Sequence, residues 1–118
     1  MKKHNFKNLQ VWQKAKVLIK EIYQITRTFP DDERFGLISQ LRRASISVMA
    51  NLAEGSGRKT SKDLGHFTTM SYGSALEIES LLIASLDLGY LNDDEYSNLE
   101  ERINEVQRML NGLGKSIK

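Results

Sequence analysis

The segment that decides the fold runs from Gln40 to Lys59 and reads QLRRASISVMANLAEGSGRK. Apolar residues recur along it at helical spacing, namely Leu41, Ala44, Val48 and Leu52. A polar series recurs at the same spacing beside them and consists of Arg43, Ser47, Asn51 and Glu54. Because residues three or four apart share one face of a helix, we expect one long helix with a polar stripe next to a core stripe.

The rest of the chain has the same helical periodicity, and proline, glycine and capping residues mark where each helix begins and ends. Pro30 ends the first helix, because a ring without an N–H cannot continue the hydrogen-bond ladder. The second is capped by Asp31 or Asp32 and stopped by Gly55-Ser56-Gly57. The third helix begins at Thr60 or Ser61, and Gly89 follows its end as the left-handed residue. The fourth helix begins at Asn92 and Glu95, which have the spacing of a capping box. The expected helices are therefore about 9–28, 32–55, 61–88 and 93–113.

Apolar seams within these helices predict how they pack. The first helix has core positions at Val11, Ala15, Leu18, Ile22, Ile25 and Phe29. The last has the cleanest seam, at Tyr96, Leu99, Ile103, Val106, Leu110, Leu113 and Ile117, with fraying expected after Leu113. Short loops between long helices force neighbours to lie antiparallel. We therefore predict an all-α protein, an up-down-up-down antiparallel four-helix bundle that forms one domain over residues 1–118.

Composition limits the class of protein. The chain has 118 residues and no cysteine, so disulfides and thiolate metal sites are excluded. No apolar run is long enough to span a bilayer, and lysines interrupt the position of a signal peptide. We expect a soluble, cytoplasmic protein with no membrane role.

Charge is unevenly distributed along the chain. Residues 1–62 hold 13 Lys or Arg against 5 Asp or Glu, whereas residues 63–118 hold 4 against 10. Two interpretations stay open. The two halves either form separate basic and acidic surfaces, or they neutralise each other inside the fold.

The third helix has more apolar surface than one bundle seam needs. Its apolar residues nearly encircle it, and they are Leu76, Ile78, Leu81, Leu82, Ile83, Leu86 and Leu88. A helix that is apolar nearly all round must be covered on nearly every side. We therefore expect the protein to associate with copies of itself.

No catalytic constellation is present. His4 and His66 are far apart in sequence, no Glu-x-x-His pair suited to a di-iron bundle occurs, and Gly55-Ser56-Gly57-Arg58-Lys59 lacks the strand that a phosphate loop requires. We expect no cofactor, no metal and no enzymatic activity.

The polar stripe has a structural and a functional interpretation. In the structural one, Asn51 and Glu54 are buried and satisfied by Arg43 or by donors of another helix, and the network comprises Arg43, Ser47, Asn51, Glu54 and Glu77. Glu54 could instead pair with Arg58. In the functional one, cations near the stripe bind phosphates.

The candidate nucleic-acid contacts are the cations of the first helix, of the second helix and of the glycine-rich turn. They are Lys14, Lys16, Lys20, Arg42, Arg43, Arg58, Lys59 and Lys62. Lys2, Lys3, His4 and Lys7 extend the first group, with Phe6 and Trp12 interleaved. Aromatic rings among lysines can stack on unpaired bases. The simpler interpretation is that Trp12 packs at the edge of the bundle.

Several segments carry a family resemblance, namely Phe6–Ala15, Phe29-Pro30, Glu33–Leu37, Gln40–Ala44, Ala50–Gly55, Gly73–Glu77 and Leu88–Leu91. Through them the chain resembles the four-helix-bundle proteins encoded in intervening sequences of bacterial 23S rRNA genes. Met49 departs from the family pattern, which often has proline there, so we expect no kink in the second helix.

The resemblance implies a ring-shaped homopentamer. The family is also similar to the accessory protein of diversity-generating retroelements, a basic pentameric bundle that binds nucleic acid and a reverse transcriptase. We therefore expect a homo-oligomer that binds nucleic acid, with structured RNA favoured over DNA. The alternative is a structural oligomeric adaptor for a protein partner, without a nucleic-acid role.

Overall fold

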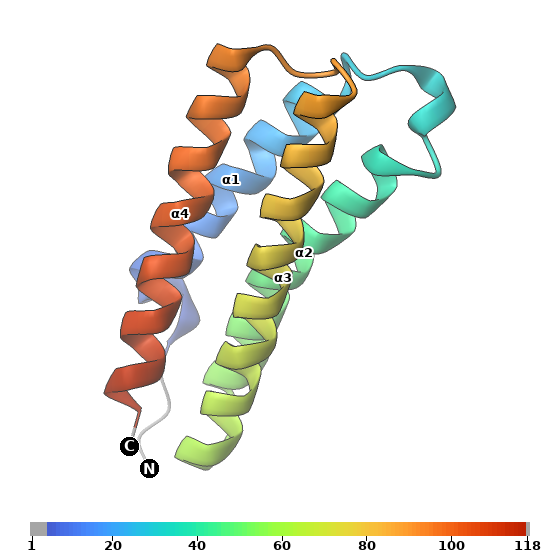
Figure 1. The fold of residues 1–118 in the computed structure, drawn as a ribbon. Helices are drawn as coiled ribbons and strands as arrows, with labels where there is room; N and C mark the ends of the chain where they lie inside the picture. Colours follow the sequence, from blue (N-terminus) through green and yellow to red (C-terminus); the bar gives the residue numbers. More distant parts are fainter. Residues whose placement is uncertain (1–4, 118) are drawn as a thin grey trace.

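Four long helices form an antiparallel up-down-up-down bundle in the computed structural model, which describes residues 5–117 (Figure 1). They are α1 (Gln10–Thr26), α2 (Leu37–Ser56), α3 (Ser61–Asp87) and α4 (Asp93–Ser116). Two short 3₁₀ helices, η1 (Phe6–Asn8) and η2 (Asp31–Glu33), precede α1 and α2. Each helix packs against the next along the chain and α4 closes onto α1, so α1 and α3 lie diagonally opposite. The predicted all-α class and bundle are confirmed.

The core lies along the bundle axis at the positions that the apolar spacing predicts. Val11, Ala15, Leu18, Ile22 and Phe29 are buried, as are Leu41, Ala44, Val48 and Leu52 of α2. In α4 the buried seam is Leu99, Ile103, Val106 and Leu110. Tyr96, Leu113 and Ile117 are half-buried at the ends of that seam. Within residues 5–117, no helix has the length and apolar character to cross a membrane.

Three of the predicted helix boundaries depend on local chemistry and are confirmed. The Thr60 hydroxyl accepts from the Asp63 N–H at 3.1 Å and caps α3. Asn92 and Glu95 form a complete capping box at the start of α4. Gly89 has φ of +80°, the left-handed conformation that lets the chain leave α3.

The start of α2 differs from the expectation. Asp31 and Asp32 belong to the separate turn η2, and α2 begins only at Leu37. In place of Asp31 or Asp32, Glu33 caps α2: its carboxylate accepts a hydrogen bond from the Leu37 N–H at 3.1 Å. A Cβ at Gly36 would collide with this same carboxylate, so glycine is required beside it.

The ends of α2 and α4 lie beyond the expected bounds. Helix α2 ends within Gly55-Ser56-Gly57 as predicted, at Ser56 with Gly57 as the C-cap, one residue beyond the expected bound of 55. Gly55 is buried against α3, where a Cβ would lie 2.7 Å from the Cβ of Phe67 and 3.3 Å from the Cδ1 of Leu64. Its role is a close approach of two helices. Helix α4 runs to Ser116 rather than fraying after Leu113.

We predict that Gly55→Ala destabilises the protein by about 1–3 kcal/mol, because the added methyl group overpacks the contact between α2 and α3. Gly65→Ala is the control, since nothing lies within 4 Å of the Cβ that it adds to the neighbouring helix. That substitution is expected to be neutral or to stabilise the helix by up to about 1 kcal/mol. Urea unfolding of both variants measures the difference, and equal stabilities would contradict the close approach.

Candidate nucleic-acid interface

The polar stripe of α2 faces α3 in its central part. The Asn51 amide donates to the carbonyl of Ser47 at 2.9 Å and to its hydroxyl at 3.0 Å. The Ser74 hydroxyl of α3 donates to the same Ser47 hydroxyl at 2.9 Å. One turn earlier along α3, Ser71 is fully buried and donates to the carbonyl of Val48 at 2.8 Å. Ser47 therefore joins α2 to α3, and Asn51 supports Ser47 from within α2.

The other residues expected in this network lie outside it. Glu54 is exposed rather than buried, and it pairs at 3.2 Å with Arg58, four residues further along the chain and just beyond the end of α2. Arg43 is exposed on α2 and Glu77 is exposed on α3. The expectation of a buried Glu54 satisfied by Arg43 is therefore wrong, because the stripe rotates out of the interface at both ends.

Cations of α1 line a hollow of about 600 Å³ on the outer surface of the bundle. Its walls are Lys7, Trp12, Gln13, Lys16, Val17 and Lys20. The Nζ of Lys16 lies 5.9 Å from the centroid of the Trp12 ring, and Phe6 packs edge-on against that ring at 5.1 Å. Trp12 is half-buried at the edge of the core. The hollow therefore combines aromatic surface with three ammonium groups.

A second hollow of about 290 Å³ adjoins the first, because Lys20 lines both. Its other walls are Ile19, Tyr23, Gln24, Arg27 and Ile46. Lys7, Lys16, Lys20 and Arg27 thus follow one side of α1, and we call these four residues the α1 cationic row. Arg27 was not among the predicted contacts, although its spacing of seven residues from Lys20 places both on one helix face.

Three of the predicted contacts already have partners within the chain, and one of them is Arg58, the partner of Glu54 described above. Lys14 lies on the side of α1 that faces α4, with its Nζ 3.6 Å from a carboxylate oxygen of Glu105. Arg42 is half-buried, and its Nε donates to the Thr26 hydroxyl at 3.0 Å. Its guanidinium also donates to the Tyr23 carbonyl at 3.3 Å and lies 4.5 Å from the centroid of the Tyr23 ring. Arg42 therefore joins α2 to α1.

Three of the predicted cations, Arg58, Lys59 and Lys62, cluster at the α2–α3 turn. Lys59 and Lys62 are exposed there, and the Arg58 guanidinium lies 4.7 Å from the centroid of the Phe67 ring. This turn is at the same end of the bundle as the beginning of α1 (Figure 1). Lys2, Lys3 and His4 lie outside the described residues.

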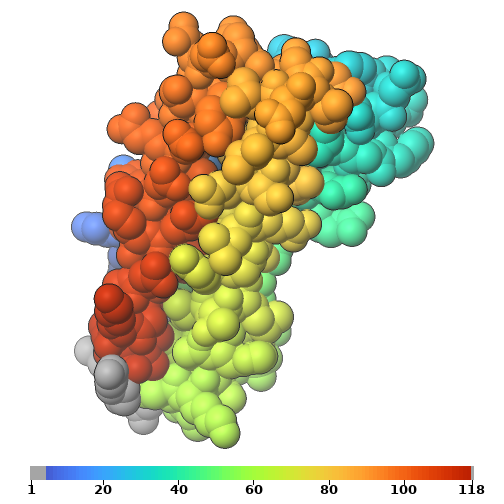
Figure 2. Space-filling view, viewed as in Figure 1, coloured from blue at the N-terminus to red at the C-terminus, as the bar shows by residue number. Residues whose placement is uncertain are grey.

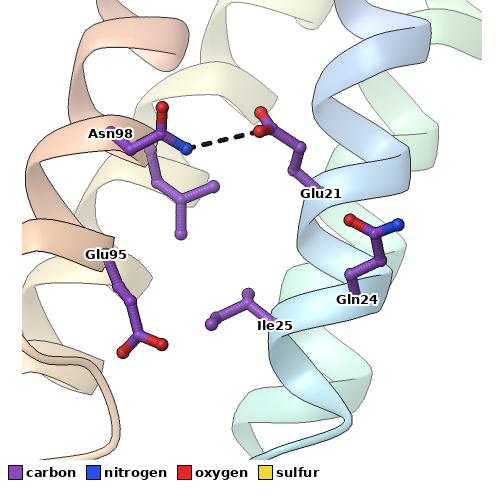
Figure 3. Close-up of a pocket in the computed structure, with 6 residues that line it drawn as sticks. Glu21, Gln24, Ile25, Glu95 and Asn98 are labelled. Atoms are coloured by element: carbon purple, nitrogen blue, oxygen red, sulfur yellow. Dashed lines mark hydrogen bonds between the residues drawn. The ribbon is translucent and has the colours of Figure 1, made fainter.

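A pocket of about 230 Å³ between α1 and α4 has the opposite character (Figure 3). It is lined by Glu21, Gln24, Ile25, Glu95, Asn98 and Leu99. Asn98 donates to Glu21 at 3.3 Å, and Arg102 forms an ion pair with the same carboxylate. Carboxylates repel phosphate, so this pocket is not part of a nucleic-acid site. Among residues 5–117, no cluster of three or more His, Asp or Glu side chains is placed to hold a metal ion.

The family model described as 23S rRNA-intervening sequence protein matches residues 7–112. The chain belongs to this family. In a crystal structure of a protein of unknown function from the S23 ribosomal protein family of Bacteroides thetaiotaomicron VPI-5482, a similar fold is found with a TM-score of 0.80. The two chains are 19% identical over 89% of this chain and 98% of that one, which shows a shared fold. A comparison with curated proteins finds no match. For this intervening-sequence protein, the fold and the family are thus established together.

Two adjacent arginines of α2 should differ in their effect on stability. We predict that Arg42→Ala destabilises the protein by about 1.5–3 kcal/mol, because it removes charged hydrogen bonds and leaves the Thr26 hydroxyl without its α2 partner. Arg43→Ala is the matched control and should stay within about 0.5 kcal/mol of the parent. Thermal unfolding of both variants measures this. An equal loss for the two would show that Arg42 does not join α2 to α1.

Proposed function

We propose that this protein is a non-enzymatic, cytoplasmic homo-oligomer that binds nucleic acid, preferentially structured RNA, through basic surface residues. The observation that carries the proposal is that Lys16 and Lys20 have no carboxylate partner in the part of the chain that the structure describes. Both line the same hollow beside Trp12, and within residues 5–117 neither forms an ion pair. Unpaired ammonium groups next to aromatic surface are suited to phosphates and to the bases they flank.

The contacts in this proposal fall into two groups at the surface. The first is Lys7, Lys16 and Lys20 around the larger hollow, and the second is Arg58, Lys59 and Lys62 at the α2–α3 turn. Arg43 is exposed apart from both, near the start of α2. Lys14 and Arg42 were also predicted as contacts from the sequence. Because both already have partners within the chain, we expect them to contribute less to the affinity for RNA. Oligomerisation would repeat both groups around the assembly, and so extend the positive field over a length of RNA.

Self-association is supported by the outer face of α3. Met70, Leu76 and Ile83 are each 43–44% exposed, and the seven-residue spacing of Leu76 and Ile83 places these two on one side of the helix. Exposed apolar side chains that gather on one face are typical of an interaction site. The number of subunits that we propose is five, as the family resemblance implies.

We expect light scattering of the parent protein to give a multiple of the 13.5 kDa chain. The double variant Leu76→Asp with Ile83→Asp should move the protein toward a single subunit, because each charge would have to be desolvated in the interface. Ser97→Asp is the control, since Ser97 is an exposed polar residue of α4 rather than of this side of α3. A parent protein that stays a lone subunit in dilute buffer would refute self-association and weaken the case for RNA binding with it.

The RNA proposal is tested by filter binding of a structured RNA at several salt concentrations. The double variant Lys16→Gln with Lys20→Gln should weaken binding and reduce the slope of log affinity against log salt by about two, because two phosphate contacts are lost. Lys14→Gln removes the same charge from the same helix, but its ammonium group is already paired with Glu105. It should change the slope less than either single substitution at Lys16 or Lys20.

No retention of RNA even at low salt would end the RNA proposal. It would favour the second candidate function, a structural oligomeric adaptor for a protein partner. That function is supported by the engagement of Arg42, Lys14 and Arg58 within the chain, which leaves fewer free cations than the sequence suggests. A stoichiometric partner that survives nuclease treatment in a pull-down would support it.

A further inference from the structure

The most exposed large apolar side chain of the described residues is Phe35, of which 88% is accessible. It lies in the loop between α1 and α2, immediately after η2. This loop, cyan in the figures, projects from the upper right of the bundle (Figures 1 and 2). Single exposed apolar residues are common at protein surfaces. What sets Phe35 apart is the way its loop is held.

The loop is fixed by Glu33, which uses both of its carboxylate oxygens. One accepts from the Leu37 N–H at 3.1 Å, and the other accepts from the Tyr90 hydroxyl at 3.0 Å. Tyr90 belongs to the loop between α3 and α4, and its ring lies 5.4 Å from the buried ring of Phe29. The hydrogen bond to Glu33 is the main reason that the pKa of Tyr90 is raised above its usual 10.0. The loop that carries Phe35 is therefore held by two hydrogen bonds, one to the start of α2 and one to the loop between α3 and α4.

A rigidly presented aromatic ring is well suited to anchor an interface. Binding is costly when a loop must be ordered at the same time, and an anchored loop avoids most of that cost. Aromatic side chains are also enriched among the few residues that carry most of the energy of an interface. The position of Phe35 thus fits a protein contact.

The charges around Phe35 indicate what it contacts. The Arg34 guanidinium lies 5.5 Å from the centroid of the Phe35 ring and forms an ion pair with Asp31 at 3.3 Å. Asp32 is exposed beside it and forms no ion pair within residues 5–117. Three acids against one arginine over residues 31–34 leave the loop acidic, so it favours a cationic surface. The hollow of about 290 Å³ on α1 and α2 has that character, because Lys20 and Arg27 border apolar surface from Ile19, Tyr23 and Ile46. It is smaller than most sites for drug-sized ligands, which measure about 300–1,000 Å³. We call it the α1–α2 socket.

We propose that Phe35 of one copy inserts into the α1–α2 socket of a second copy, with Asp32 facing Arg27 of that copy. The inference rests on the self-association proposed above and adds a second contact to that of the outer face of α3. The two surfaces are different parts of the chain, so the contact is head-to-tail and can close into a ring. Lys7, Lys16 and Lys20 line the adjoining hollow and stay free for polyanions.

The first experiment is sedimentation velocity of Phe35→Ala across a range of concentrations. Because the ring is mostly solvent-exposed, the subunit should keep its fold and its thermal unfolding temperature. We expect the dissociation constant of the oligomer to rise at least about tenfold. Phe35→Leu, which keeps an apolar side chain, should fall between the parent and the alanine variant. An unchanged dissociation constant for Phe35→Ala would overturn the proposal.

The second experiment locates the contact, using the absence of cysteine from the chain. Phe35→Cys and Ile46→Cys are made in separate chains, co-expressed and treated with a short bismaleimide. No chain holds both cysteines, so a 35–46 link identified by mass spectrometry must join two copies. Co-expression of Phe35→Cys with Leu76→Cys is the control and should give no such link.

The outcomes separate this inference from the proposed self-association. A 35–46 link together with weakened assembly of Phe35→Ala supports the insertion. A 35–76 link would place Phe35 on the α3 face of the second copy and overturn it. An oligomer that forms without either link would overturn the insertion and leave self-association standing. A protein that is a lone subunit at every concentration would overturn both.

Discussion

The close approach of α2 and α3 is the constraint on which the rest of the structure depends. Gly55 has no side chain at the point where Phe67 and Leu64 cross it, and serines replace larger residues further along the interface. This spacing lets Ser71 reach a backbone carbonyl of α2, which fixes the register of the two helices. The register in turn decides which part of the α2 polar stripe is inside and which is exposed.

The same constraint determines which cations are available to a ligand. Because α2 is turned toward α3, Arg42 points back to α1 and is held by Thr26 and Tyr23, whereas Arg43 lies on the surface. Some charges of the basic and acidic halves of the chain neutralise each other inside the fold, and others form a separate basic surface. Lys14 pairs with Glu105 across α1 and α4 and Arg102 pairs with Glu21, while the α1 cationic row stays on the surface.

Features that depend on neighbouring residues were predictable from the sequence. The seam of α4, the capping box of Asn92 and Glu95 and the left-handed Gly89 all follow from contacts within four residues. The start of α2 was not predictable in this way, although acidic residues near it suggested a cap. Glu33 caps the helix only because the loop doubles back past Gly36 and Tyr90 holds the second carboxylate oxygen from 57 residues away.

The sequence alone determined the four helices, their core faces, their antiparallel order and the family, because helical periodicity and turn chemistry are local properties of the chain. Only the tertiary structure decided the roles of individual polar side chains. Arg42 and Arg43 are adjacent and chemically identical, and Ser47 and Glu54 share one stripe, yet in each pair one residue is engaged between elements and the other is exposed. The rotation of each helix about its own axis makes that choice, and it is set by packing between residues distant in the sequence.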